Sequence, residues 1–318
     1  MSNTLPRIFS LARPQPRFRS RSLPLHSLPD HAKGLLITTL GVLILTPDSL
    51  LLRLMEVDHW TALFWRGSLQ CLCLVCLLTV WYRRRTPAIF RSIGRLGLLL
   101  AGVFAVSTTM FVISITLTLV ANTLVIISAA PFFAAGFSLI FLKEKIAGHT
   151  CLAIVAAFAG IALLTLDSEG RGTLAGDLAA LAVAALMGAY FTIVRASKEV
   201  DMIPAMALSG ALVALIALPL AAFPAMSESQ LLAAGTMGFV IAPLSFALIT
   251  IGPRYLPAPE VSLLLLVETV LGPFWVWLVI SEEPGVLSLI GGAVVVVTIL
   301  MHSLYGLHRY RVRKTAQL

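Results

Sequence analysis

The sequence predicts an all-α integral membrane protein in which ten transmembrane helices form two inverted five-helix repeats. Three features support this prediction: the composition, a series of ten long apolar segments, and a similarity between two of those segments. Of the 318 residues, 58% are hydrophobic and 12% are charged, whereas about a quarter of the residues in a soluble domain are charged. Runs of about 20 residues without a polar face are long enough to cross a bilayer.

The ten apolar segments define the expected helices and leave a basic tail at each end. Several connections are very short, so neighbouring helices should pack as antiparallel hairpins. We expect a disordered basic tail over residues 1–33, a first repeat over 34–167, a second repeat over 174–305 and a basic tail over 306–318. The expected helices cover residues 34–52, 61–82, 96–118, 121–141, 148–167, 174–195, 203–223, 231–252, 258–280 and 286–305.

The distribution of Lys and Arg predicts the orientation. If both termini are cytoplasmic, 20 of the 23 basic residues lie on that side, Arg53 and Arg171 lie outside, and Arg66 lies within a span. Cytoplasmic loops carry such an excess of positive charge. We therefore expect a multi-pass protein of the inner (cytoplasmic) membrane whose basic residues meet lipid headgroups, with no nucleic-acid partner. The acid-poor, Arg-rich amino terminus also fits an organellar transit peptide, which the sequence leaves open.

Two segments share a pattern that indicates an internal repeat. ANTLVIISAAPFFAAGFSLIFLKEK (121–145) and PEVSLLLLVETVLGPFWVWLVISEE (259–283) both begin with a short polar stretch and end near an acid, Glu144 or Glu282, 138 residues apart. They are the fourth and ninth expected helices. Because five helices is an odd number, the two halves must have opposite orientations. Inverted repeats are typical of secondary transporters, which bind substrate near the membrane midplane.

These segments also carry a resemblance to a known family. Over about residues 34–305 the chain resembles the EamA-like ten-helix members of the drug/metabolite transporter superfamily. The resemblance rests on Trp65-Arg66 in the second helix, on the stretch from Pro131 to Glu144, and on RYLPAPEVSLLLLVE from Arg254 to Glu268. It implies secondary transport of a small metabolite by alternating access, with export of an amino acid or related compound as the favoured direction.

This chain departs from the family pattern at three positions. The family often has Gly before the acid that ends the fourth and ninth helices, where this chain has Lys143 and Ser281. It often has Pro directly after the ninth-helix acid, where this chain has Thr269. The expected fold does not depend on these positions. An inference from the family about the identity of the substrate does depend on them.

Glu268 is the first candidate functional residue. It lies about ten residues into the ninth helix, which at 1.5 Å per residue is about 15 Å deep, near the bilayer centre. A charge at that depth costs a few kcal/mol, so it is expected to face a partner or a wet cavity. There it could exchange a proton or receive a cationic substrate. The alternative is a protonated Glu268 that only hydrogen-bonds a neighbouring helix.

Asp48 and Arg66 are expected at the same depth in the first two helices, which a short loop connects. An ion pair between them would neutralise both charges in a medium of low dielectric constant. The alternative is that Arg66, with Gln70 one turn deeper on the same face, binds a carboxylate of the substrate.

Neutral polar residues suggest further parts of a cavity wall. Ser107, Phe111 and Ser114 share a face of the third helix, although small hydroxyl side chains also cement packed membrane helices. The resemblance implies that the second, fourth and sixth helices line the cavity, which adds Trp65, Asn122, Ser128 and Tyr190. Glycines are expected to allow close helix approach, namely Gly102, Gly136, Gly210 and Gly272.

Other function classes lack support in the sequence. It contains no P-loop, no H-E-x-x-H, no G-x-S-x-G and no dinucleotide fingerprint, so we expect no enzyme and no cofactor. The four cysteines lie in apolar runs and the histidines are scattered along the chain, so we expect no metal site.

The expected partners are a small-molecule substrate, protons and membrane lipids, with homodimer formation left open. An importer or exchanger of a charged cofactor-like metabolite is an alternative, and a lipid-modifying membrane enzyme is a distant one.

Overall fold

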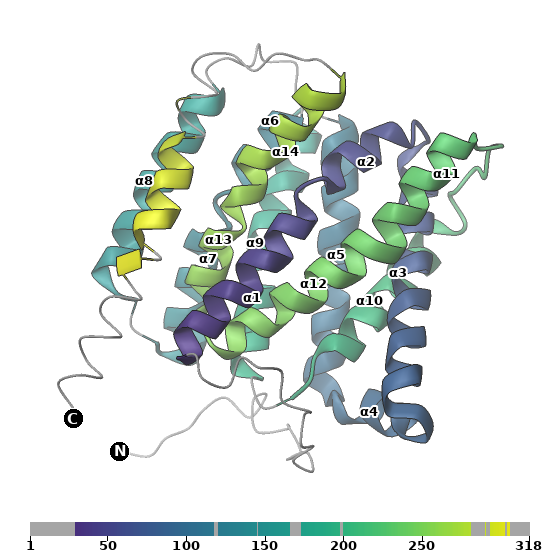
Figure 1. Cartoon of the computed structure of the whole chain (residues 1–318), viewed down its shortest axis with the longest axis horizontal. Helices are drawn as coiled ribbons and strands as arrows, with labels where there is room; N and C mark the ends of the chain where they lie inside the picture. The colour runs from purple at the N-terminus through teal and green to yellow at the C-terminus, as the bar shows by residue number, and fades with distance from the viewer. Residues whose placement is uncertain are drawn as a thin grey trace.

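The computed structural model is an all-helical bundle whose long helices run between two opposite ends of the molecule (Figure 1). It describes residues 29–117, 120–144, 146–165, 173–197, 200–280, 290, 293–302 and 304–305. Within these residues the helices follow the order and approximate positions of the ten expected segments. Six segments are long and apolar enough to cross a membrane, and four are shorter apolar helices.

In the first half of the chain, two of the five segments are interrupted. The first is divided between α1 and α2, and the fourth between α6, α7 and the π-helical η4. The elements are α1 (Asp30–Leu45), α2 (Asp48–Leu54), α3 (His59–Tyr82), η3 (Arg83–Arg85), α4 (Thr86–Ser92), α5 (Gly94–Leu117), α6 (Val120–Ile127), α7 (Ala130–Phe137), η4 (Ser138–Leu142) and α8 (Gly148–Thr165).

In the second half of the chain, the eighth and ninth segments are interrupted. The eighth contains a π-helical turn, and the ninth is divided between α13 and α14. The elements are α9 (Leu174–Ala196), α10 (Ile203–Ala217), α11 (Glu228–Gly235), η5 (Thr236–Ile241), α12 (Ala242–Ile251), η6 (Gly252–Arg254), α13 (Ala258–Leu264), α14 (Leu266–Ile280) and a final helix, Ala293–His302.

Helices of the two halves pack directly against each other. The principal contacts join α1 to α12, α3 to α10, α5 to α9, and α7 to both α9 and α13. Each of these pairs takes one helix from each half of the chain. The central space of the bundle is therefore bounded by both halves.

Three of these interruptions are breaks between two α-helices, namely α1 and α2, α6 and α7, and α13 and α14. Proline explains the first two. A proline inside a helix has no N–H group, and its ring clashes with the carbonyl group four residues earlier. Pro47 directly precedes α2, and Pro131 follows a turn at Ser128 and Ala129. The break at Leu265 has no such proline, because Thr269 occupies the position that corresponds to Pro131 in the second repeat.

The fourth and ninth segments break at nearly equivalent positions. Subtracting the repeat offset of 138 from 265 gives 127, next to the turn at Ser128 and Ala129.

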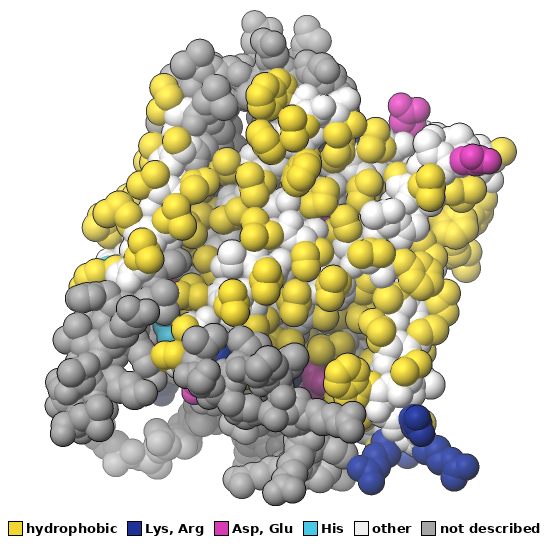
Figure 2. Space-filling view, viewed as in Figure 1, with side chains coloured by type: hydrophobic (Ala, Val, Ile, Leu, Met, Phe, Trp, Pro, Cys, Tyr) yellow, Lys and Arg dark blue, Asp and Glu magenta, His cyan; other side chains and the backbone are white. Residues whose placement is uncertain are grey.

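The surface matches a lipid environment. Large hydrophobic side chains are exposed on many helices, including Leu72, Trp81, Leu152 and Leu215, and they cover most of the described face in Figure 2. Basic side chains gather at the lower end, where α4 lies in Figure 1. There Arg83 to Arg85 are all exposed.

Glycine allows close approach at α3 and α10. A Cβ atom on Gly67 would lie 2.6 Å from the carbonyl oxygen of Gly210, and one on Gly210 would lie 2.8 Å from that of Gly67. The expectation of close helix approach is therefore met at Gly210. It is also met at Gly272, where an added Cβ would lie 3.2 Å from Ser49 Oγ, and it is wrong at Gly102 and Gly136, where an added Cβ would meet no described atom within 4 Å.

We predict that Gly67→Val destabilises the protein, because its side chain would collide with the backbone of α10. The expected loss is about 1–3 kcal/mol, the usual cost of overpacking. Thermal unfolding in detergent measures it, with Gly102→Val as the matched control on α5. Equal melting temperatures for the two variants would contradict the close α3–α10 contact.

Candidate functional site

A cavity between the two halves of the bundle is the candidate site. Its polar lining consists of Asp48, Arg66, Ser107, Thr108, Ser262, Glu268 and Thr269. Its apolar lining includes Phe104, Phe111, Met187 and Phe246. The charged groups come from α2, α3 and α14, so helices of both halves contribute to the same charged region.

The helix breaks position the two carboxyl groups of the cavity. Asp48 lies in the first turn of α2 and Glu268 in the first turn of α14. The N-terminal end of a helix presents unpaired N–H groups and a partial positive charge, which favours an anion. Each carboxyl group therefore lies where the interruption of a helix provides local electrostatic stabilisation inside the membrane.

Asp48 and Arg66 form the ion pair that their common depth predicts. Arg66 Nη1 donates to both carboxylate oxygens of Asp48, at 2.6 and 2.7 Å. The two side chains are 1% and 4% exposed. Both bonds use one guanidinium nitrogen instead of the two parallel donors of a bidentate fork. The Nε of Arg66 is buried and has no acceptor among the described residues.

Glu268 differs from Asp48 in having no such partner. Its side chain is partly accessible and lines the cavity. Asp48 and Arg66 are close enough to act on it electrostatically, yet it makes no ion pair or side-chain hydrogen bond with another described residue. The cavity therefore holds one neutralised ion pair and one further carboxyl group that can accept a ligand or a proton.

Two residues expected beside these groups do not line the cavity. Gln70 does not line the cavity with Arg66, because its amide donates to the carbonyl of Met206 at 3.3 Å and joins α3 to α10. Ser107 and Phe111 do line the cavity, but Ser114 does not. Ser114 is fully buried between Thr123 Oγ1 and the carbonyl of Gly176, each at 2.8 Å.

Of the four residues chosen from the family resemblance, the three whose side chains the structure describes are not among the cavity-lining residues. Trp65 packs edge to face on Phe64, with ring centroids 5.9 Å apart. Tyr190 is fully buried behind the wall, where its hydroxyl group bonds Thr250 and its ring lies 5.2 Å from that of Phe104. Ser128 is buried in the turn between α6 and α7, and the side chain of Asn122 lies outside the described residues.

Sequence reasoning missed several lining residues. Ser262 and Thr269 lie on either side of the break at Leu265 and bracket Glu268. Their positions close to Glu268 in the sequence could have identified them. Phe246 reaches the cavity from α12 and meets Phe104 edge to face at 4.7 Å. Nothing in the local sequence marks this contact.

A polar network joins the two halves near the ends of α7 and α9. Arg195 Nε donates to Glu144 at 3.1 Å, and Arg195 Nη1 donates to the carbonyl of Pro253 at 3.2 Å. Arg254 donates to Asp201 at 3.0 Å. These contacts tie the fourth helical segment to the sixth and eighth.

Comparison with known proteins decides the family. The model of the EamA-like transporter family matches residues 32–166 and 174–304. The chain belongs to the EamA-like transporter family. It is therefore a multi-pass membrane transporter with two EamA domains and not an enzyme, as the sequence predicted. The ten-helix, two-repeat fold is likewise confirmed.

Solved structures agree with this EamA fold. A crystal structure of another protein matches with a TM-score of 0.71 and 17% sequence identity, covering 86% of this chain and 98% of that one. Likeness at this identity shows the fold alone. No curated protein matches the sequence.

We predict strong energetic coupling between Asp48 and Arg66. Asp48→Asn or Arg66→Gln alone leaves one buried charge without its partner, which costs about 3–5 kcal/mol. The double variant should lose less than the sum of the two. A double-mutant cycle of unfolding free energies in detergent measures the coupling.

A surface ion pair provides the control for this cycle. Lys33 and Asp30 are 3.1 Å apart, and the Asp30 side chain is 76% exposed, so Asp30→Asn should change stability by less than about 1 kcal/mol. Additive losses at Asp48 and Arg66 would show that the pair is not energetically coupled.

Proposed function

We propose that this EamA-family protein is a secondary active transporter that exports a small polar metabolite, an amino acid or a related compound, by alternating access. The observation that carries the proposal is the unpaired carboxyl group of Glu268 beside the Asp48–Arg66 pair, in a cavity bounded by both halves of the chain. Inverted-repeat transporters bind substrate in this position.

The lining of the cavity suits a ligand that carries both charge and an apolar part. Glu268 can accept hydrogen bonds from a substrate amine. Arg66 lines the cavity and uses only Nη1 for Asp48, so we assign its other guanidinium N–H groups to a substrate carboxylate. Phe104, Phe111 and Phe246 supply an apolar wall for a side chain. This combination favours an amino acid over a purely apolar compound.

Glu268 also provides a means of coupling to a proton gradient. A protonated Glu268 beside the neutral Asp48–Arg66 pair leaves the cavity without net charge. A substrate ammonium group and a proton would compete for the same carboxyl group, so one binds as the other leaves. Such competition exchanges an outgoing substrate for an incoming proton, and it requires no ATP-binding motif.

The polar contacts at one end of the bundle suggest how access could alternate. Glu144 and Arg195 come from opposite halves, and their 3.1 Å ion pair holds these halves together at that end. The breaks beside Pro47, Pro131 and Leu265 lie between rigid half-helices, where a bend needs few changes in backbone angles. We infer that the halves rock about the cavity as this pair opens and closes.

We predict that Glu268→Gln abolishes transport or removes its dependence on pH, because an amide neither carries a negative charge nor exchanges a proton. A thermal-shift screen of amino acids, amines, nucleosides and vitamins first identifies a stabilising ligand. Transport of that compound into and out of proteoliposomes under imposed pH gradients then measures activity and direction.

Glu228→Gln is the matched control for this experiment, because Glu228 is an exposed acid in the first turn of α11. It should transport like wild type. Unchanged transport by Glu268→Gln at every pH would remove Glu268 from the mechanism. Uptake in place of export, or strict exchange of a charged cofactor-like compound, would support the alternative direction or substrate class.

We further propose that the protein lies in the cytoplasmic membrane with both termini inside, and this orientation can be tested directly. The exposed Arg83 to Arg85 and the excess of basic residues support it. In a bacterial host, green fluorescent protein fused after Leu318 should fluoresce, and alkaline phosphatase fused there should be inactive. The opposite pair of results would reverse the orientation.

A further inference from the structure

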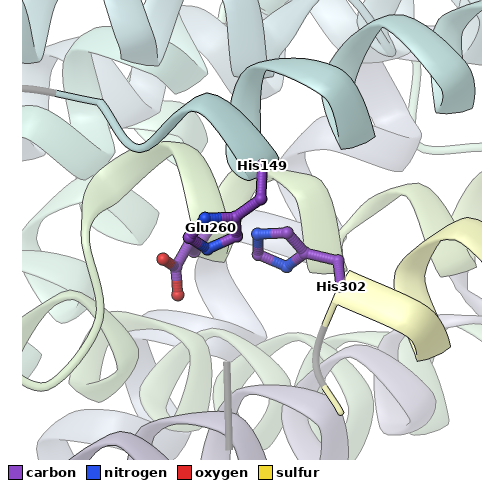
Figure 3. Close-up of side chains that lie close together, drawn as sticks. All are labelled: His149, Glu260 and His302. Atoms are coloured by element: carbon purple, nitrogen blue, oxygen red, sulfur yellow. The ribbon is translucent and has the colours of Figure 1, made fainter. Parts of the chain in front are cut away.

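A second group of polar side chains meets outside the cavity, at one end of the bundle. His149 lies in the first turn of α8, Glu260 lies in the first turn of α13, and His302 ends the helix Ala293–His302. Figure 3 shows the three side chains close together, with the two imidazole rings beside each other. One potential ligand atom from each residue lies within 4.8 Å of the other two. The histidines that are scattered in sequence are therefore not all scattered in space.

The cluster is enclosed by protein. Glu260 and His302 are each 8% exposed, and His149 is half-buried. The rings of His149 and His302 stack with centroids 5.3 Å apart and an angle of 28° between their planes. A buried carboxylate is costly unless charges or hydrogen bonds compensate it. His31 compensates one carboxylate oxygen of Glu260 at 3.1 Å, and a cation held between the carboxylate and the rings would compensate the other.

Neighbouring groups orient two of the three side chains. His302 Nε2 lies 3.2 Å from Thr150 Oγ1, so if it donates there the Nδ1 lone pair of His302 is available to a metal. His31 Nε2 lies 3.1 Å from one carboxylate oxygen of Glu260, which leaves the other oxygen available. Metal-binding histidines and carboxylates are held by outer hydrogen bonds of this kind.

His31 has a second buried ring nitrogen. Its Nδ1 atom has no hydrogen-bond partner among the described residues, and a buried polar atom is normally satisfied by protein, water or a ligand. Because Nε2 of the same ring faces Glu260, Nδ1 points away from that carboxylate, so His31 acts on the cluster through Nε2.

We propose that His149, Glu260 and His302 bind a divalent transition-metal ion of the Zn²⁺ class, with a fourth position open to water. Two imidazoles and one carboxylate form a ligand set typical of zinc sites with an open position. Mg²⁺ and Ca²⁺ prefer sites made of oxygen ligands. The site is separate from the transport cavity, because none of its three ligands lines that cavity.

The position of Glu260 connects this site to the transport cavity. Glu260 and the cavity residue Ser262 lie two residues apart in α13, which ends at the break before Glu268. A metal ion would fasten α13 to α8 and to the final helix. If the proposed transport mechanism holds, the ion should slow movement of α13 and therefore slow transport.

Zinc titration of the full-length purified protein tests the site directly. After removal of metals, isothermal titration with ZnCl₂ should give one tight site per chain. His149→Gln and Glu260→Gln should each weaken that site by at least about tenfold, and His31→Gln by about tenfold or more as an orienting residue. CoCl₂ should give the intense visible absorption of a tetrahedral site in wild type, and this absorption should be lost in His149→Gln.

Two control variants separate this site from other histidines. His59→Gln changes a histidine at the start of α3, and the double variant His26→Gln, His308→Gln changes histidines near the two ends of the chain. Both should bind Zn²⁺ like wild type. Each variant's melting temperature without metal checks its folding, and His302→Asn replaces any variant that fails to fold.

Several outcomes would overturn the site. The first is that the wild-type protein does not bind Zn²⁺ saturably. The second is that His149→Gln and Glu260→Gln both bind Zn²⁺ with wild-type affinity, and the third is that the control variants lose binding. Equal affinity for Mg²⁺ would also overturn the assignment. Binding is measured without transport, so failure of the transport proposal leaves this test intact. Inhibition of transport by Zn²⁺ in wild type but not in His149→Gln would support the link to α13, and equal inhibition would exclude it.

Discussion

The buried ion pair between Asp48 and Arg66 is the interaction around which the cavity is organised. Neither charge is tolerable alone at this depth, because desolvation of an isolated ion costs several kcal/mol. Held together at 2.6 Å, they join the second half of a broken helix to α3 and leave Glu268 as the unpaired carboxyl group of the cavity. A ligand or a proton that enters the cavity therefore meets the carboxyl group of Glu268, which can be protonated or ionised, beside the neutral Asp48–Arg66 pair.

The two repeats contribute different side chains to the cavity at equivalent positions. Segments α6–α7 and α13–α14 break at nearly equivalent positions, and subtracting 138 from 268 gives Ala130, which also lines the cavity. One repeat thus presents a carboxyl group where the other presents a methyl group. The shared backbone geometry shapes a central space between the halves, while a single side-chain difference gives that space its chemistry.

The helix α13 belongs to both unusual sites of the molecule. Glu260 in its first turn faces two histidines at one end of the bundle, while Ser262 and the following break face the cavity. Because α13 has only seven residues, the proposed ion site and the break before Glu268 lie within two turns of each other. This proximity is the physical basis of the proposed link between ion binding and transport.

The sequence by itself determined the membrane class, the helix order and the repeat, because long apolar runs and their spacing mark each span along the chain. It therefore located Glu268 and paired Asp48 with Arg66. Only the tertiary structure decided which helix faces meet. Lipid and protein neighbours are both apolar, so periodicity does not separate them. For that reason the sequence did not show that Gln70, Ser114 and Tyr190 lie outside the cavity lining, or that His149 and His302 meet across distant helices.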